Sequence, residues 1–488
     1  MAQSKSATRI ALVNPPPPQR IEAYDRPDYG HLGLAYLAAV VRDGGHEVHI
    51  VDAKLDRLGF RKAVSRVVAL KPDVLGVTAM THEIRHVAIF ANEIKRLLPD
   101  LLVVVGGSHV NATVAETLTE FSVFDFGAYG EGEHTLLELV TKLESGESLT
   151  EIRGLIYREG DRVITNPPRP YIEELDALPF PAWDLFPRHK LRNFALLTAR
   201  GCPFRCKFCR PLGHKLRERS PASVIEELEY VVDEFGVQKS YLWVWDETFG
   251  LHRERAFRLI DMMIEKGLHN RFSWFVHARV DVATEDLLVK MKEANCDTIG
   301  IGIETGNRET LTRSKKGISL EQAEHTNSFA KSIGLKTNTY FILGHPNETE
   351  KTIQETIDFA VRLNGTVPVF GIMIPYPGTE IYELAKRGEG GYKLVARSWD
   401  DYNKQFGNAL ELTNISRRRL KYYQLKAYAM VFIRNKRYRE FVRFCWSFRR
   451  EAAARLFGTF RFARYLTAGF HRLTRRDGRW GADRFSRS

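Results

Sequence analysis

Three cysteines close together in the chain are the residues with the clearest chemical potential. Cys202, Cys206 and Cys209 have the spacing Cys-x3-Cys-x2-Cys, in a chain of 488 residues with five cysteines in all. Thiolates this close together bind iron–sulfur clusters or zinc. Three thiolates bind three irons of a four-iron cluster and leave the fourth iron open. A structural zinc ion needs a fourth ligand, for which only His214 is near, so the pattern favours the cluster.

Strand and helix patterns alternate around this motif and must position it. The segment 194–199, directly before the cysteines, has a strand pattern. Five further strand patterns follow, at 240–245, 272–277, 298–303, 337–343 and 369–374, with helical patterns between them. Six βα units predict a partial (β/α)6 barrel, in which active sites lie at the carboxyl ends of the strands.

The N-terminal part of the chain has a second βα pattern. Short apolar strands are predicted at 9–14, 46–52, 74–78, 101–105 and 124–128. Such alternation predicts a doubly wound parallel sheet, whose ligands bind beyond the carboxyl ends of the strands. The fold class is therefore α/β. We predict four regions: a sheet domain (1–148), a linker with a hairpin (149–190), the barrel (191–392) and a helical, basic and aromatic C-terminal region (393–488).

The cysteine motif resembles that of the radical S-adenosylmethionine (SAM) superfamily, and the predicted barrel is that superfamily's fold. Further motifs resemble one branch of it, at 245–249, 277–281, 300–306, 344–349 and 375–379. Together with the N-terminal sheet, they make the chain similar to the cobalamin-binding radical SAM enzymes of the class B methyltransferase type, over about residues 8–390.

The resemblance implies three cofactors: a [4Fe-4S] cluster on the three cysteines, SAM on the open iron, and cobalamin. In this family the reduced cluster cleaves SAM to a 5′-deoxyadenosyl radical, which removes a hydrogen atom from an unactivated carbon. Methylating members then transfer a methyl group from methylcobalamin. The resemblance also implies a small-molecule substrate and an external electron donor such as flavodoxin or ferredoxin.

Carboxylates at the ends of two barrel strands are the candidate SAM ligands. We expect Glu304 to accept a hydrogen bond from SAM, and Asp246 or Glu247 to accept from its ammonium group. The alternative for each is an ordinary ion pair or a helix cap. Arg279 and Asp281 are expected to pair with each other. No residue is assigned a catalytic role.

Candidate cobalamin-binding residues lie where the N-terminal strands end. They are Thr78, Thr81, Gly106, Gly107, Gly130, Glu131 and Gly132. Glycines allow the backbone to approach a large flat ligand closely, although glycine at a βα turn is also common turn chemistry. The Asp-x-His-x-x-Gly motif that supplies a histidine ligand in other cobalamin proteins is absent. We expect His109 to lie near the corrin edge without binding cobalt.

The positive charge of the chain is concentrated at its C-terminal end. The net charge is +12, but residues 416–488 carry 21 Lys and Arg against 4 Asp and Glu, and the preceding residues are net negative. A nucleic-acid-binding body is therefore not expected. Aromatic residues mixed with arginines, as in 429–434 and 457–465, suit either helices packed on the barrel or an interfacial membrane contact. The chain has no signal-peptide pattern at its start, so we expect it in the cytoplasm, with the membrane surface as an added location.

The function favoured by the sequence is C-methylation of an unactivated carbon in a hydrophobic or natural-product-like small molecule. One alternative is radical cyclisation, oxidation or ring rearrangement with the same cofactors or without cobalamin. Another is a non-catalytic protein that binds zinc or an iron–sulfur cluster.

Overall fold

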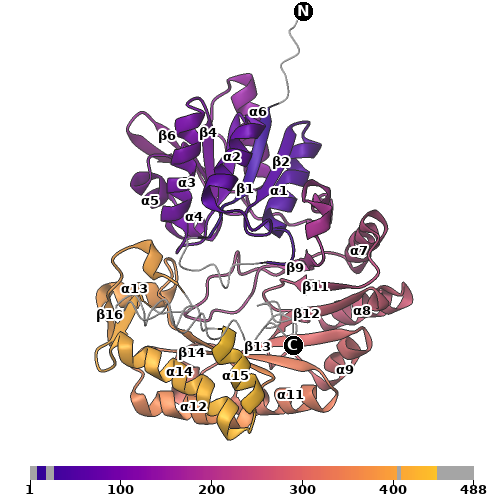
Figure 1. The fold of residues 1–488 in the computed structure, drawn as a ribbon, viewed down its shortest axis with the longest axis vertical. Helices are drawn as coiled ribbons and strands as arrows, with labels where there is room; N and C mark the ends of the chain where they lie inside the picture. The colour runs from indigo at the N-terminus through magenta and orange to yellow at the C-terminus, as the bar shows by residue number, and fades with distance from the viewer. Residues whose placement is uncertain (1–7, 18–26, 404–407, 448–488) are drawn as a thin grey trace, which may run out of the picture.

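The computed structural model describes residues 8–17, 27–403 and 408–447. Two α/β units lie one above the other, and helices from the C-terminal part pack on the lower unit (Figure 1). The predicted α/β fold is confirmed.

The upper unit, here called the sheet domain, contains a seven-stranded sheet in the order β2-β1-β3-β4-β5-β6-β7. Its strands are β1 (Arg9–Asn14), β2 (Glu47–Asp52), β3 (Val74–Thr78), β4 (Leu102–Gly106), β5 (Phe126–Ala128), β6 (Leu155–Glu159) and β7 (Arg162–Thr165). Its helices are α1 (Leu32–Asp43), α2 (Phe60–Leu70), α3 (Ile84–Leu97), α4 (Ser108–Thr113), α5 (Ala115–Glu120) and α6 (Glu133–Ser145). The first five strands are parallel. Residues 10–13 of β1 are almost completely buried because helices cover both faces of the sheet.

The hairpin that we expected in a linker belongs to this sheet. β6 pairs antiparallel with β5, and β7 pairs with β6. Leu155 and Ile156 are fully buried by this pairing, so apolar burial attaches the hairpin to the sheet domain. The predicted domain boundaries themselves stay a prediction.

The lower unit is a partial barrel of six parallel strands in the order β15-β14-β13-β12-β11-β8. The strands are β8 (Phe194–Leu196), β11 (Ser240–Val244), β12 (Phe272–Ala278), β13 (Cys296–Glu304), β14 (Lys336–Leu343) and β15 (Val367–Ile372). The helices between them are α7 (Pro221–Phe235), α8 (Arg253–Glu265), α9 (Glu285–Glu293), α10 (Arg308–Arg313), α11 (Leu320–Ser332) and α12 (Glu350–Leu363). All six predicted strands are present. In β14 every second residue is buried, because one face packs on helices and the other faces the inside of the barrel.

Shorter elements complete the fold. They are β9 (Ala199–Arg200), β10 (Arg217–Glu218), β16 (Tyr392–Leu394), β17 (Leu410–Leu412), α13 (Glu380–Arg387), α14 (Arg417–Arg434), α15 (Tyr438–Ser447) and five short 3-10 helices, η1 (Leu175–Ala177), η2 (Trp183–Leu185), η3 (Arg188–Lys190), η4 (Leu268–Asn270) and η5 (Trp399–Asp401). α14 covers the edge strand β15: the Gln424 side chain donates to the Phe370 carbonyl (2.7 Å) and the Tyr428 hydroxyl accepts from the Phe370 N–H (3.0 Å). Helices α14 and α15 are present in the predicted C-terminal region, but residues 392–412 contain the pair β16–β17, and the aromatic segment 457–465 lies outside the described residues. In the described part of the chain, no helix has both the length and the apolarity that a membrane crossing requires.

Candidate functional site

The three cysteines lie on one loop, residues 201–216, here called the cysteine loop. The antiparallel ribbon of β9 and β10 closes the loop at its base. Gly201 has φ +89°, and a Cβ there would lie 2.3 Å from the Lys215 carbonyl oxygen, so only glycine fits. The Cys202 N–H donates to the Gly213 carbonyl (3.1 Å), and the Lys207 N–H donates to the Ser314 carbonyl (3.1 Å). These bonds bring the loop over the carboxyl ends of the barrel strands.

Two cations lie among the surroundings of the cysteines. Cys202 and Cys206 are half-buried, and Cys209 is exposed. Burial raises the pKa of the Cys206 thiol, while the positive charges of Lys316 and Arg279 act in the opposite direction. Within the described ranges, no three His, Cys, Asp or Glu side chains lie close enough to bind a single metal ion. Three sulfur donors on one loop beside two cations are a donor set that fits an iron–sulfur cluster.

Glu304 ends β13 beside the cysteine loop in an unusual backbone conformation. Its φ is +74°, which is rare for a residue other than glycine, and the β13–β14 register shifts between Gly302 and Glu304. The Glu304 carboxylate pairs with Lys316 (2.9 Å), and both side chains are about nine-tenths buried. Burial alone would lower the pKa of Lys316, but Glu304 raises it above its ordinary value. This carboxylate therefore has one fixed cationic partner and lies at the active-site end of the barrel.

Asp246 is buried and bonded to the backbone that leads into the cysteine loop. Its carboxylate accepts from the N–H of Thr198 (2.7 Å), from the Thr198 hydroxyl (2.5 Å) and from the N–H of Ala199 (3.1 Å). Burial raises its pKa, and these hydrogen bonds act against that rise. The arrangement suits a residue that orients the start of the loop.

Glu247 and its neighbours lie closer to the cysteines. The exposed Glu247 carboxylate accepts from the Leu212 N–H (3.3 Å), and the next residue, Thr248, has its hydroxyl 3.9 Å from the Cys202 sulfur. The Arg279–Asp281 pair is confirmed, with two hydrogen bonds of 2.9 and 2.8 Å.

Arg279 also lies over the ring of Phe204 in the cysteine loop, 3.5 Å from its centroid. Thr248, Arg279 and Lys316 follow β11, β12 and β13 in turn. The cysteine loop therefore meets the ends of three consecutive strands.

The candidate cobalamin residues form a second group, at the carboxyl edge of the sheet domain. Gly107 has φ +102°, and a Cβ there would lie 2.8 Å from the Thr78 hydroxyl, so the turns after β3 and β4 touch. The Ala79 N–H donates to the Gly106 carbonyl (3.0 Å). Thr81 is buried close by in sequence. The structure thus brings four predicted residues to two adjacent strand ends.

The turn after β5 and the nearby His109 test whether this edge fits cobalamin. A Cβ on Gly130 would meet no atom within 4 Å, and the Gly130 N–H is fixed by the Asn111 side chain (2.7 Å). His109 is fully buried, and neither ring nitrogen has a hydrogen-bond partner. Burial lowers its pKa to about 4, so the ring is neutral. Open space over Gly130 and an unsatisfied buried imidazole fit a large ligand with amide groups.

The side chain of Glu131, one of the candidate cobalamin residues, contacts the ribbon of β9 and β10. Its buried carboxylate accepts from Arg217 (2.8 Å) and Arg200 (3.1 Å) of the ribbon, and from the Ile172 N–H (2.7 Å). It therefore points toward the base of the cysteine loop. Gly132 flanks it and caps α6.

An aromatic face inside the barrel was missed at the sequence level. Trp243 and Trp245 of the β11 segment stack with centroids 6.0 Å apart, and Tyr29 of the sheet domain contacts both rings. Further ring contacts extend this face to Phe275, His277 and Tyr340. The alternating pattern Tyr-x-Trp-x-Trp at 241–245 was the available signal, because alternate strand residues share a face.

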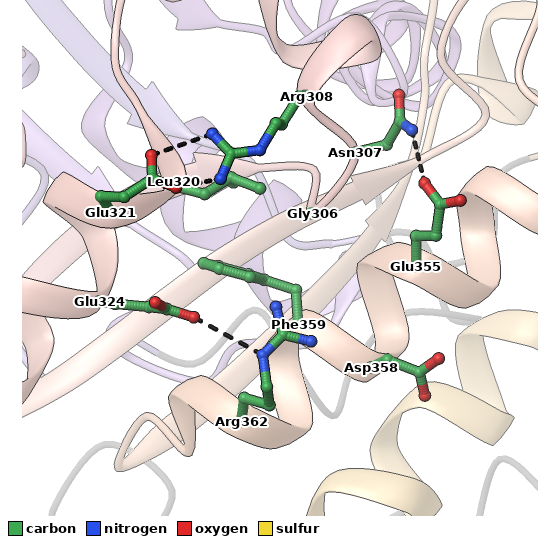
Figure 2. A pocket seen from close by; sticks show the side chains of 10 residues that line it. All are labelled: Gly306, Asn307, Arg308, Leu320, Glu321, Glu324, Glu355, Asp358, Phe359 and Arg362. Carbon is green, nitrogen blue, oxygen red and sulfur yellow. Dashed lines mark hydrogen bonds and ion pairs between the residues drawn. The ribbon is translucent and has the colours of Figure 1, made fainter.

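A separate pocket lies among α10, α11 and α12, and the residues that line it lie outside the cysteine loop (Figure 2). Two ion pairs lie in it, Arg308 with Glu321 (3.1 Å) and Arg362 with Glu324 (3.6 Å), and the Asn307 side chain donates to Glu355 (2.6 Å). Each arginine of this pocket is thus matched by a glutamate, whereas within the described part of the chain Glu355 and Asp358 have only neutral amide partners.

Comparison with known proteins gives two family matches and several relatives. Residues 24–140 match the B12 binding domain, and residues 196–360 match the radical SAM superfamily. An uncharacterized methyltransferase of Pyrococcus horikoshii is 34% identical over 88% of this chain and 93% of its own length. The anaerobic magnesium-protoporphyrin IX monomethyl ester cyclase of Rubrivivax gelatinosus is 29% identical over 76% of this chain and 68% of its own length.

A solved structure has the same fold. It is the radical SAM methyltransferase TsrM of Kitasatospora setae, with a TM-score of 0.69 and 20% identity, over 87% of this chain and 89% of that chain. At that identity the likeness concerns the fold alone. The cofactor expectations are confirmed at the level of family, because a radical SAM domain uses a [4Fe-4S] cluster and SAM, and a B12 binding domain binds cobalamin. The chain belongs to the cobalamin-dependent radical SAM enzymes of the methyltransferase family.

Proposed function

We propose that this enzyme methylates an unactivated carbon of a hydrophobic small molecule, with Cys202, Cys206 and Cys209 as the ligands of its cluster. When bound, the cluster and SAM supply radical chemistry and cobalamin supplies the methyl group. The chain binds and orients these groups and keeps water away from them. Relatives named as methyltransferases support methyl transfer, and the cyclase relatives keep cyclisation as the second candidate.

The observation that carries the substrate class is the aromatic face inside the barrel. Leu242 and Val244 of β11 are buried toward the helices, so Trp243 and Trp245 point to the other face. Gly300 of β13 pairs with His277 of β12, and a Cβ on Gly300 would come within 3.0 Å of the His277, Phe275 and Tyr340 rings. The Trp243 ring nitrogen is buried without a partner. A wall of rings suits a flat, largely apolar substrate.

The remaining candidate residues have distinct roles in this proposal. Glu304, already paired with Lys316, accepts a hydrogen bond from SAM, and Glu247 accepts from its ammonium group. Asp246 orients the backbone of the cysteine loop. Thr78, Thr81, Gly106, Gly107, Gly130 and Gly132 line the cobalamin side. An external electron donor of the flavodoxin or ferredoxin type completes the reaction.

Anaerobic reconstitution with iron and sulfide tests the cluster ligands. The wild-type chain should become brown and produce 5′-deoxyadenosine from SAM after reduction, whereas Cys202→Ala should do neither. Cys296→Ala removes a fully buried thiol in β13 and serves as the control, because it should keep the colour and the product. A colourless wild-type chain that binds one zinc would contradict the proposal.

Metabolite comparison tests methyl transfer and the substrate face together. Extracts of cells with and without the enzyme should contain a pair of compounds that differ by about one methylene group, and the reaction should give S-adenosylhomocysteine beside 5′-deoxyadenosine. Trp245→Ala should reduce the methylated compound while 5′-deoxyadenosine still forms. Deoxyadenosine without S-adenosylhomocysteine would instead support cyclisation or oxidation.

We also propose a peripheral membrane contact through α14 and α15. Exposed apolar side chains on these helices are Tyr422, Leu425, Ile433, Tyr438 and Val442, and exposed cations beside them include Arg418, Arg434, Arg439 and Arg443. This mixture suits an anionic lipid surface. The enzyme should float with phosphatidylglycerol vesicles, less with pure phosphatidylcholine, and poorly after Leu425→Glu plus Ile433→Glu. Val289→Glu, at an exposed apolar residue of α9, is the control, and equal flotation of all forms would exclude the contact.

A further inference from the structure

Four charged side chains join the sheet domain to the base of the cysteine loop. They are Glu131 and Glu133, at the turn after β5 and the start of α6, and Arg200 and Arg217, which form the cross-strand pair of the ribbon. We call them the Glu–Arg cluster. The two arginines face each other on adjacent strands, where like charges repel. The carboxylates from the other domain neutralise them.

The contacts within the Glu–Arg cluster are short, and the side chains that make them are almost inaccessible to solvent. Arg217 donates to both oxygens of Glu131 (2.9 and 2.8 Å), Arg200 donates to Glu131 (3.1 Å), and Arg200 also donates to Glu133 (2.8 Å). Side-chain exposure is 2% for Glu131 and Arg217, 9% for Glu133 and 11% for Arg200. Removing one partner of an ion pair this buried destabilises the fold strongly, because the remaining charge is neither paired nor solvated.

Arg217 depends strongly on Glu131. Its Nε and Nη2 atoms are buried and have no hydrogen-bond partner, so its Nη1 carries its polar contacts, to Glu131 and to the Ile172 carbonyl (2.7 Å). Its guanidinium lies over the Tyr171 ring, 4.9 Å from the centroid. The same ring packs on the cysteine loop, since a Cβ on Gly213 would lie 3.0 Å from it. Displacement of Glu131 would therefore move Arg217 at the base of the cysteine loop, and with it the Tyr171 ring that packs on the loop.

From this geometry we propose that Glu131 and Glu133 are positioning residues that couple cobalamin binding to the cluster. Both follow Gly130, in the turn proposed to contact the corrin, and both fix the ribbon from which the cysteine loop starts and ends. Cobalamin that stabilises this turn stabilises the ribbon, and an assembled cluster stabilises the turn in return, because such coupling is reciprocal. The inference rests on the proposed cluster ligands and needs no assumption about the substrate.

The test measures binding without turnover. Hydroxocobalamin affinity is determined for the cluster-free and the cluster-loaded enzyme, and the release of iron to an Fe(II) chelator is followed with and without hydroxocobalamin. The wild type should bind hydroxocobalamin about fivefold or more tightly when the cluster is present. Hydroxocobalamin should also slow iron release.

Glu131→Gln and Glu133→Gln should bring the affinity ratio toward one and abolish the protection of the cluster. Glu173→Gln is the matched control: it removes an exposed pair with Lys215 of the same loop and should behave as the wild type. If Glu131→Gln does not fold, Glu133→Gln, which retains Glu131, decides alone. A ratio of one in the wild type, or a wild-type ratio in the glutamine variants, would overturn the proposal. These binding measurements do not depend on methyl transfer. A failure of the coupling proposal can therefore be distinguished from a failure of the proposed methyltransferase function.

Discussion

Glu304 combines two costs at one residue, a left-handed backbone and a buried charge. A backbone with φ +74° costs of order 1 kcal/mol for a residue with a side chain. The ion pair with Lys316 offsets the desolvation cost of the buried Glu304 carboxylate only while both partners are present. The proposed hydrogen bond to SAM would give this strained residue, beside the cysteine loop, a role in addition to its ion pair.

Glu304→Gln should lower the free energy of unfolding by about 3 kcal/mol, because Lys316 would stay buried and charged without its partner. The double variant Glu304→Gln plus Lys316→Gln should be less destabilised than the sum of the two single variants. Chemical denaturation of all three forms measures this. Lys315→Gln, which breaks an exposed pair with Glu380, should change stability by at most about 1 kcal/mol. Additive losses in the double variant would contradict the coupling.

Glu348 predicts a pH dependence of stability. Burial raises its pKa to about 8, although the N–H groups of Gly344 and His345 donate to its carboxylate. The folded state therefore keeps a proton that the unfolded state loses near pH 4.5. This contribution to stability is complete below pH 4.5 and is lost as the pH rises through about 8, with a slope of up to about 1.4 kcal/mol per pH unit.

Glu348→Gln should remove that slope, so its unfolding free energy relative to the wild type should increase between pH 5 and pH 8 and then level off. Denaturation curves at several pH values measure the difference. Glu350→Gln is the control, because the Arg419 pair lowers the pKa of Glu350 to about 2, far below this range. A constant difference between Glu348→Gln and wild type would show that Glu348 is already ionised in the folded state.

Some site residues were readable from the sequence and others were not. The three cysteines were marked by their spacing, which indicates a shared ligand, and their role as cluster ligands stays a prediction. The arginine partners of Glu131 lie 69 and 86 residues away, on two strands of only two residues each. No local sequence pattern marks such a contact. Its position after a glycine at a strand end suggested cobalamin, but the side chain points to the ribbon. His109 was expected near the corrin edge, whereas its complete burial without a partner needed the three-dimensional packing.

At the scale of elements, the ribbon of β9 and β10 determines the shape of the cysteine loop. Gly201→Ala should prevent the loop from closing, because its Cβ would overlap the Lys215 carbonyl, and the reconstituted enzyme should bind markedly less iron. Gly236→Ala is a matched control with a similarly positive φ but open space around its Cβ. It should cost about 1 kcal/mol of stability and leave the iron content unchanged. Equal iron in both variants would exclude a shaping role for Gly201.

The regular strands followed closely from the sequence, and the irregular ones did not. β3 has the predicted bounds, because a strand buried on both faces reads as a continuous apolar run between turn residues. β9 and β10 have two residues each, too few for any periodic signal. The β6–β7 hairpin was visible as a hairpin, but strand pattern does not reveal which sheet a hairpin joins. The partner of β6 became clear only from its pairing with β5.

For the whole molecule, the main observation is that the two units share a core. One hydrophobic cluster contains Ile10 and Leu12 of β1 together with Phe272 and Trp274 of β12. η5 adds a second link, since Trp399 contacts the ring of His109 (centroids 5.0 Å apart) and donates to Glu120 (2.6 Å).

Calorimetry should therefore find a single unfolding transition, with equal calorimetric and van't Hoff enthalpies. Trp399→Ala should lower its midpoint, with a loss of about 2 kcal/mol, because the ring is only half-buried. Tyr438→Ala, at an aromatic residue that is 57% exposed, should leave the midpoint nearly unchanged. Two separate transitions in the wild type would mean that the units are energetically independent.

The facing arginines of the ribbon have a consequence for how the enzyme matures. The turn that carries the two carboxylates precedes the ribbon in the chain, and its carboxylates neutralise both guanidinium groups once the two units pack together. Before the two units pack together, repulsion between Arg200 and Arg217 would separate β9 from β10, and the three thiols would then not be held close together. We therefore expect the three thiols to be positioned for iron only after the two units have packed together.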